Sequence, residues 1–214
     1  MPVERCAMKR YYTTRKTKQQ LQGEQTKESL FKVALEEIKR QGYYSVTVDE
    51  ICMKAGVSKG TFYVHYKSKE DIIRENYQNE LNHFVLPKLE QYRKECPNAN
   101  PIERLENYLT TYMHFAYNVG AELGMLSFQF LTASQTALGE EMARRVSIPV
   151  LRQIVIDGQE SGVFTARLSC EQLMLHVDTF VVGIILLWNT NPERFDIIET
   201  GKALIPRFIF GLKD

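Results

Sequence analysis

Apolar residues recur at helical spacing along most of the chain, and the strict alternation that marks a strand never lasts. Near the start, Leu30, Ala34 and Ile38 stand four apart and form one apolar stripe. This spacing predicts a helix that begins near Thr26 and ends at Gly42, because glycine commonly terminates a helix.

Two short helices are predicted next. Thr47 and Glu50 stand three apart, as in a reciprocal N-terminal capping box, and predict a helix over 48–55 that Gly56 ends. Ser58 then caps a third helix of about two turns. The sequence therefore predicts two short helices joined by a three-residue turn.

The rest of the chain also shows helical spacing. A long fourth helix runs through Leu81, and Pro87 must kink or end it because proline removes a backbone donor. Asn100 and Pro101 combine an N-cap with a proline at the first helical position. Further helices are predicted over 122–133, 138–161, 171–189 and 192–212. The predicted fold is all-α, with about nine helices in total.

The net charge of +1 conceals an uneven distribution along the 214 residues. Residues 1–70 carry 14 Lys and Arg against 8 Asp and Glu, whereas residues 71–214 carry 13 against 18. A basic first third suits contact with a polyanion. We expect three parts: a basic, disordered arm over 1–24, a small helical domain over 25–71, and a larger one over 72–214.

Cysteine usage and hydropathy indicate a cytoplasmic protein. The four cysteines are scattered, without a CxxC pair or a histidine at zinc-ligand spacing, so we expect reduced thiols and no metal or cofactor. No secretory signal is recognisable at the start. The most apolar run, residues 180–188, is shorter than the ~20 residues that cross a bilayer, so we expect no membrane span.

The third predicted helix has two contrasting sides. At about 100° per residue, Phe62 and Tyr66 fall on one side and Tyr63 and Gly60 on the other. A side without a bulky residue at Gly60 can approach a groove of DNA closely. The two short helices thus fit a helix-turn-helix, with Phe62 and Tyr66 in the core.

The stretch from Thr26 to Asp71 resembles the DNA-binding domain of the TetR family of transcriptional regulators. The run AGVSKGTFYVHYKSKE is similar to the signature of that family. Beyond this stretch, the resemblance rests on helix number, chain length and the terminal segment GIILLW. The matching residues are Gly42, Tyr43, Thr47, Val48, Ile51, Ala55, Gly56, Val57, Ser58, Gly60, Thr61, Phe62, Tyr63, His65, Tyr66, Lys69 and Glu70.

The resemblance implies a set of DNA contacts. Threonine, tyrosine, histidine and lysine side chains would bind phosphate, and few would reach base edges, as is general in DNA recognition. At Val64 this chain departs from relatives, which often carry an aromatic or polar residue, so apolar contact is expected there. The expected DNA-binding residues are Thr47, Val48, Lys59, Gly60, Thr61, Tyr63, Val64, His65 and Lys69.

The larger domain is expected to dimerise and to bind a small molecule. The segment EQLMLHVDTFVVGIILLW is apolar almost all round and needs cover on both sides, which a bundle of two helices from each subunit supplies. The expected dimer residues are Val146, Val150, Ile154, Gly158, Gly183 and Leu187. Aromatic residues with a few polar neighbours suggest an effector site at Tyr108, Tyr112, Phe115, Phe128, Gln129, His176, Asp178 and Phe180.

Three functions remain open on the sequence alone. The first is a homodimeric repressor that a small-molecule effector releases from a palindromic operator. The second is an effector-independent DNA-binding dimer whose larger domain is a scaffold, and a cavity above ~300 Å³ would separate the two. The third is an enzyme, against which stands the absence of any nucleophile–base motif or glycine-rich phosphate loop. Ligand, operator and regulated genes are not encoded in these patterns.

Overall fold

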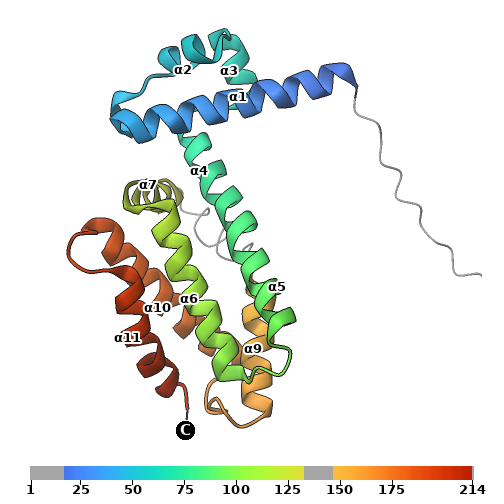
Figure 1. Ribbon diagram of the computed structural model, residues 1–214, viewed down its shortest axis with the longest axis vertical. Coiled ribbons are helices and arrows are strands. Elements are labelled where there is room, and N and C mark those ends of the chain that lie inside the picture. Colours follow the sequence, from blue (N-terminus) through green and yellow to red (C-terminus); the bar gives the residue numbers. More distant parts are fainter. Residues whose placement is uncertain (1–16, 133–146, 214) are drawn as a thin grey trace, which may run out of the picture. The chain divides into compact units, whose positions relative to one another are not determined.

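The computed structural model describes residues 17–132 and 147–213 and forms two compact units, one up to Lys69 and one from Glu70 onward (Figure 1). Every regular element in these described residues is a helix, which confirms the all-α prediction. We call the two parts the N-terminal unit and the C-terminal unit and describe each by itself.

The N-terminal unit is built on a helix longer than predicted. Helix α1 spans Lys18–Gln41, because Thr17 and Gln20 form a reciprocal capping box well before Thr26. Residues 18–24 are therefore helical, and the part of the expected arm that precedes residue 17 lies outside the described residues. A short 3₁₀ turn, Tyr43–Ser45, follows α1.

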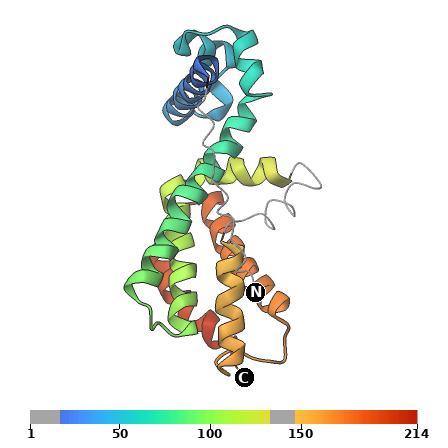
Figure 2. The ribbon, with the colours of Figure 1, turned by 90° about the vertical axis from the view of Figure 1, so that its right-hand side faces the viewer.

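The two short helices have the predicted bounds: α2 spans Val48–Ala55 and α3 spans Lys59–His65. Both begin at a hydroxyl cap, since Thr47 accepts a hydrogen bond from the Glu50 amide and Ser58 accepts one from the Thr61 amide. Gly56 ends α2 with a left-handed backbone, φ 67°, which glycine adopts without strain. In both views α2 and α3 lie on one side of α1 (Figures 1 and 2).

The inner side of α3 closes the core of the N-terminal unit. The Phe62 side chain is fully buried and Tyr66 is 3% exposed, and their rings lie 5.9 Å apart between centroids. Leu30 and Ile38 of α1 and Ile51 of α2 are also fully buried. The predicted rotation of α3, with Phe62 and Tyr66 inward, is confirmed.

An ionic network joins α1 to α2 beside this core. The Glu37 carboxylate, which is largely buried, binds the Lys54 ammonium at 2.5 Å and the Arg40 guanidinium at 2.5 Å. These hydrogen bonds, that of Lys54 first, hold the pKa of Glu37 below its usual range. Glu50 accepts from Gln41 at 2.9 Å, so its side chain does not complete the capping box expected with Thr47.

The C-terminal unit begins with one continuous helical run. Helix α4 (Lys69–Glu80) passes through a π-helical turn (Leu81–Val85) into α5 (Leu86–Glu95). Pro87 does not end the run as one form of the prediction had it; the irregularity is the π turn just before it, where the loss of the proline N–H is accommodated. The other helices are α6 (Pro101–Val119), α7 (Ala121–Thr132), α9 (Ile148–Glu160), α10 (Cys170–Thr190) and α11 (Ile197–Phe210).

Two of these helices differ from the predicted ranges. Helix α11 starts at Ile197 rather than near 192, because the Asp196 carboxylate caps it by accepting from the amides of Ile198 and Glu199. The predicted helix over 138–161 is described from Ile148 onward, and its first part lies outside the described residues.

Helix α6 is the centre of the C-terminal unit and packs against α5, α7, α9, α10 and α11 (Figure 1). Small residues permit the closest approaches. A Cβ atom on Gly201 of α11 would lie 2.9 Å from Met113 Cγ of α6. One on Gly158 of α9 would lie 2.0 Å from the Phe164 ring. Both glycines are therefore required by packing within the subunit.

Helix α10 extends well beyond the nine-residue apolar run considered in the sequence. It has 21 residues and a mean hydropathy of 1.6, so by length and composition it could span a membrane. The core helix of a soluble protein passes the same test. Only 28% of its apolar window is buried within the subunit, so much of this helix is uncovered.

We expect Phe62→Ala to lower the free energy of unfolding by ~3–5 kcal/mol, because it leaves a cavity in the core of the N-terminal unit. Val64→Ala, on the 79%-exposed side of the same helix, is the matched control and should change stability by about 0.5 kcal/mol at most. Urea unfolding of the full chain measures both. Equal midpoints for the two variants would contradict the described rotation of α3.

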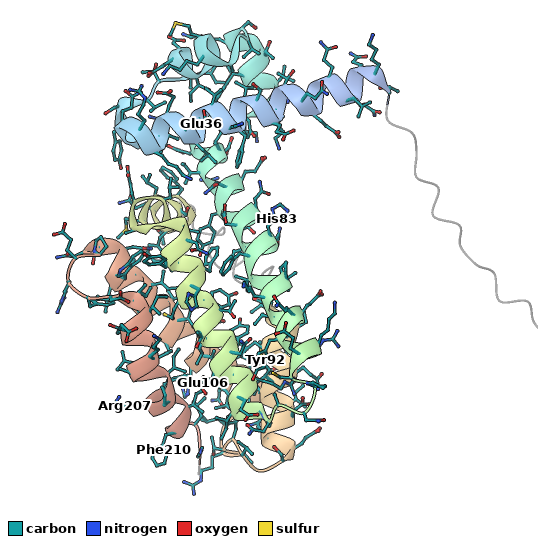
Figure 3. All side chains as sticks on the ribbon, in the orientation of Figure 1. Glu36, His83, Tyr92, Glu106, Arg207 and Phe210 are labelled. Carbon is teal, nitrogen blue, oxygen red and sulfur yellow. The ribbon has the colours of Figure 1, made fainter. Side chains whose placement is uncertain are left out.

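The Glu37 network makes stability depend on pH. A carboxylate whose pKa is lowered by folding stabilises the folded state above its unfolded pKa, and this contribution is lost as the pH falls through the folded pKa. Between about pH 5 and about pH 3, the melting temperature of the wild type should therefore fall more steeply than that of Glu37→Gln. Glu36→Gln, an exposed neighbour on α1 (Figure 3), should keep the wild-type slope.

Candidate functional site

The outer side of α3 is open to solvent. Tyr63 is 57% exposed and Val64 is 79% exposed. Gly60, which falls between these two residues around the helix axis, is exposed as well. A Cβ atom added at Gly60 would have one neighbour within 4 Å, the Ser58 hydroxyl at 3.6 Å. The N-terminal unit thus leaves a shallow, uncovered strip along α3 with a phenol hydroxyl at its edge.

The starts of α2 and α3 carry small hydroxyl residues beside this strip. Thr47 is exposed and its hydroxyl caps α2, while Val48 is half-buried in the first turn. The Thr61 hydroxyl, on α3, lies 2.9 Å from the Ser58 hydroxyl. Each of these hydroxyl groups therefore has a local role in its helix, and a second contact with a ligand uses its remaining lone pair or proton.

Lys59, at the first turn of α3, has a partner that the sequence pattern did not reveal. Its ammonium binds the Asp49 carboxylate of α2 at 2.6 Å, and both side chains are about three-fifths exposed. An exposed pair of this kind is weak and exchanges readily with other ions. The signal for it is the acid in the first turn of α2, which the turn at Gly56 brings next to the start of α3.

Lys69 is not placed as expected. Its ammonium donates to the backbone carbonyls of Tyr43 and Val46, at 2.6 and 2.7 Å, and lies 4.1 Å from the Tyr43 ring centroid. Lys69, one of the expected DNA contacts, is therefore bonded within the N-terminal unit. The carbonyl groups at the start of the 3₁₀ turn and just after it need donors, and the side chain at the start of α4 reaches them. His65, by contrast, is half-exposed at the end of α3.

In the C-terminal unit, three of the expected effector residues meet around one serine. The hydroxyls of Tyr108 and Tyr112 lie 3.4 and 2.6 Å from the Ser147 hydroxyl, and the Phe115 ring lies 6.2 Å from that of Tyr112. Burial raises the pKa of Tyr108 well above its ordinary value, so its phenol is neutral. These residues satisfy one another and are part of the core.

The other expected effector residues lie at or near the surface. Gln129 and His176 are exposed. Phe180 of α10 is stacked on Phe208 of α11, with 4.2 Å between ring centroids. Phe128 and Asp178 are half-buried. Among the described residues, no three His, Cys, Asp or Glu side chains gather closely enough to hold a metal ion.

A cavity of about 250 Å³ lies elsewhere in the C-terminal unit, between the end of α5, the turn into α6, α6 and α9. Its volume falls below the ~300 Å³ expected of a drug-sized site. None of the expected effector residues lines it, whereas Tyr92, Arg104 and Asn107 do. The Arg104 guanidinium is ion-paired with Asp157 of α9, a long-range pairing for which the sequence carried no signal.

The expected dimer residues divide into two groups. Ile154 and Gly158 are buried within the subunit, and Val150 lines the cavity, so this side of α9 faces inward and the prediction for it is wrong. Gly183 of α10 has open space around it, and Leu187 is 56% exposed. Val146 lies outside the described residues.

Comparison with known proteins agrees with the helix-turn-helix geometry. The family described as "Bacterial regulatory proteins, tetR family" matches residues 30–75. The fatty acid metabolism regulator protein of Bacillus subtilis is 24% identical over 182 residues, which cover 84% of this chain and 91% of that protein. The transcriptional regulator AcrR of Shigella flexneri is 27% identical over 200 residues, covering 89% of this chain and 90% of that protein.

Solved structures share the fold. The regulator FadR of Bacillus subtilis, in complex with stearoyl-CoA, has a TM-score of 0.67 at 21% identity and covers 86% of this chain and 98% of its own. FadR of Thermus thermophilus, in complex with lauroyl-CoA, has a TM-score of 0.66 at 20% identity and covers 86% of this chain and 93% of its own. Residues 30–75 therefore match the DNA-binding domain of the TetR family of bacterial regulators, and the chain as a whole is similar to regulators of that family in sequence and fold.

Proposed function

We propose that this regulator is a homodimeric, cytoplasmic repressor that binds a palindromic operator and is released by a small-molecule effector. The observation that carries the DNA-binding part is the rotation of α3. Phe62 is fully buried, while Gly60, Tyr63 and Val64 lie uncovered on the opposite side. A helix that is anchored on one side and open on the other is what a major groove accepts.

The DNA contacts follow from this side of α3. The Tyr63 hydroxyl, the His65 imidazole and the Lys59 ammonium, once it leaves Asp49, would bind phosphate. The small residues Gly60 and Thr61 would let the backbone approach the groove, and Val64 would contact a thymine methyl. Thr47 and Val48 would touch phosphate at the start of α2. Lys69 is removed from this set because backbone carbonyls hold its ammonium.

An exposed stripe on α10 supports the dimer. Leu175, Thr179, Gly183 and Leu187 stand four apart, so they share one side of the helix, and the two leucines are 62% and 56% exposed. The open space at Gly183 would let a second α10 approach closely. Phe210 and Leu204 extend the apolar surface onto α11, where Phe210 projects outward (Figure 3). We therefore propose α10 and α11, rather than α9, as the dimer helices.

The effector is proposed from kinship. Because one relative is named as a regulator of fatty acid metabolism and two structural neighbours hold acyl-CoA thioesters, such thioesters belong among the first compounds to test. The alternative is an effector-independent dimer. The hydroxyls of Tyr108, Tyr112 and Ser147 support it, since they lie within hydrogen-bond distance of one another without a ligand.

We expect Tyr63→Ala to weaken binding to an operator selected from random DNA by roughly tenfold, because a charge-assisted hydrogen bond to phosphate is lost. Met53→Ala is the matched control, as Met53 is 74% exposed on α2 and lies outside the assigned contacts. Mobility-shift titrations measure both affinities. Loss of affinity in both variants, or in neither, would contradict the assigned side of α3.

The salt dependence of operator binding distinguishes the roles of Lys59 and Lys69. Lys59→Gln should reduce the salt dependence of binding by about one counterion. Lys69→Gln should leave the salt slope unchanged and lower the melting temperature instead, because it removes two hydrogen bonds within the N-terminal unit. A reduced salt slope in Lys69→Gln would return that residue to the phosphate contacts.

We expect Leu175→Glu to convert the dimer into a monomer, because it places a carboxylate in the proposed apolar contact. Light scattering after size exclusion measures the mass, and circular dichroism checks that the variant keeps its helices. Leu21→Glu, at a 47%-exposed leucine of α1, is the matched control and should stay dimeric. A dimeric Leu175→Glu variant would exclude α10 as the interface.

A further inference from the structure

The cavity at the end of α5 has an apolar floor. Leu89 of α5 and Ile154 of α9 are buried, and Val150 of α9 is half-buried beside them. The Tyr92 ring adds an aromatic wall, and Tyr92 lies where α5 nears its end (Figure 3). The lining therefore offers an organic molecule apolar contact on several sides.

One guanidinium in this cavity is held in a fixed position. Arg104 of α6 pairs with the Asp157 carboxylate of α9, and Asp157 also accepts from Gln153 at 2.7 Å. Arg104 is 30% exposed and has five N–H donors, of which Asp157 uses part. Because Asp157 binds the guanidinium and is itself held by Gln153, the guanidinium has a preferred direction without a ligand, which reduces the entropy cost of binding one.

The lining offers donor groups to an anion. It holds two guanidinium groups, Arg104 and Arg93, and one carboxylate, Glu90, while the Asp157 carboxylate already takes part of Arg104. Arginine binds a carboxylate through two parallel N–H groups, and such bonds are stronger than those between neutral groups. The Asn107 side chain, also in the lining, can add an amide donor. The arginine and asparagine side chains therefore match a ligand that has one negatively charged end, and the floor of the cavity suits the apolar body of that ligand.

We infer that this cavity binds a small carboxylate with an apolar or aromatic body, its carboxylate on Arg104 and its body on the floor of Leu89, Val150 and Ile154. At about 250 Å³ the cavity is smaller than the pockets of drug-sized ligands and excludes a nucleotide-bearing thioester. The binding itself rests on the cavity alone. A regulatory role for it rests on the proposed function.

The first experiment compares matched probes on the full-length protein. Octanoate and phenylacetate are the carboxylate probes, and 1-octanol and 2-phenylethanol are their neutral partners. Saturation-transfer NMR gives the affinities. Peptide mass spectrometry gives the rate at which N-ethylmaleimide alkylates Cys96, an exposed thiol of the lining, with Cys170 of α10 as the internal reference. We expect at least one carboxylate to bind roughly tenfold more tightly than its neutral partner and to slow alkylation of Cys96.

Two variants locate the site. Val150→Phe fills the cavity and should abolish both the binding measured by NMR and the protection of Cys96. Ile148→Phe, at a half-buried residue of the same helix outside the lining, should keep both. Arg104→Gln should lose the preference for the carboxylate and keep the affinity for the neutral partner. A merely structural role for Arg104 would weaken both probes alike, and that outcome overturns the proposed contact.

Two outcomes overturn the inference as a whole. One is the absence of Cys96 protection by every carboxylate probe, and the other is protection that persists in Val150→Phe. Neither readout uses DNA, so a failure here leaves the operator-binding proposal to its own mobility-shift test. If a bound probe also lowers operator affinity in the wild type and not in Val150→Phe, the cavity is the effector site of the proposed repressor.

Discussion

Burial of the Phe62 ring fixes the rotation of α3 about its own axis, and the assignments in the N-terminal unit follow from that rotation. The helix has seven residues, too few for its own hydrogen bonds to hold it in place, so tertiary packing must do so. With Phe62 and Tyr66 in the core, a turn of 100° per residue leaves Gly60 and Tyr63 outside. The surface proposed to meet DNA is therefore a consequence of which rings are buried in the core.

The cations of the N-terminal unit show why charge alone is a poor guide to DNA contacts. Lys69 is held by two backbone carbonyls and Lys54 by Glu37, so both ammonium groups stabilise the domain. Lys59 is paired as well, but its partner Asp49 is exposed and can be exchanged for phosphate at small cost. The basic first third of the sequence thus contains lysines that hold the domain together and one that is available for the proposed DNA contact, and the burial of each partner distinguishes them.

The sequence predicted local structure well where a single residue determines it. Thr47, Gly56 and Ser58 set the bounds of α2 and α3 through caps and a positive φ, and these signals are readable without the fold. Which side of a helix faces inward was predictable on α3, where the rings of Phe62 and Tyr66 stand opposite Gly60, and not on α9, where apolar residues lie on several sides. Pairings between distant segments, such as Arg104 with Asp157 or Gly201 with Met113, leave no trace in spacing. The inward-facing side of α9 depends on such pairings, which is why it was predicted wrongly, whereas the effector and the remaining dimer residues stay predictions.

The chain between Lys69 and Glu95 connects the two proposed activities covalently. It is helical throughout, with Lys69 bonded to carbonyls of the N-terminal unit at its start and Tyr92 in the cavity lining near its end. The π-helical turn at Leu81–Val85 is its irregular point, where the backbone hydrogen bonds change register. A ligand that moves α5 acts on this turn, which can transmit the motion to α4 or absorb it. Under the proposed function, the stiffness of the π turn would therefore set how much of a movement of α5 reaches α4, and a substitution among its five residues would change the coupling free energy between cavity and operator.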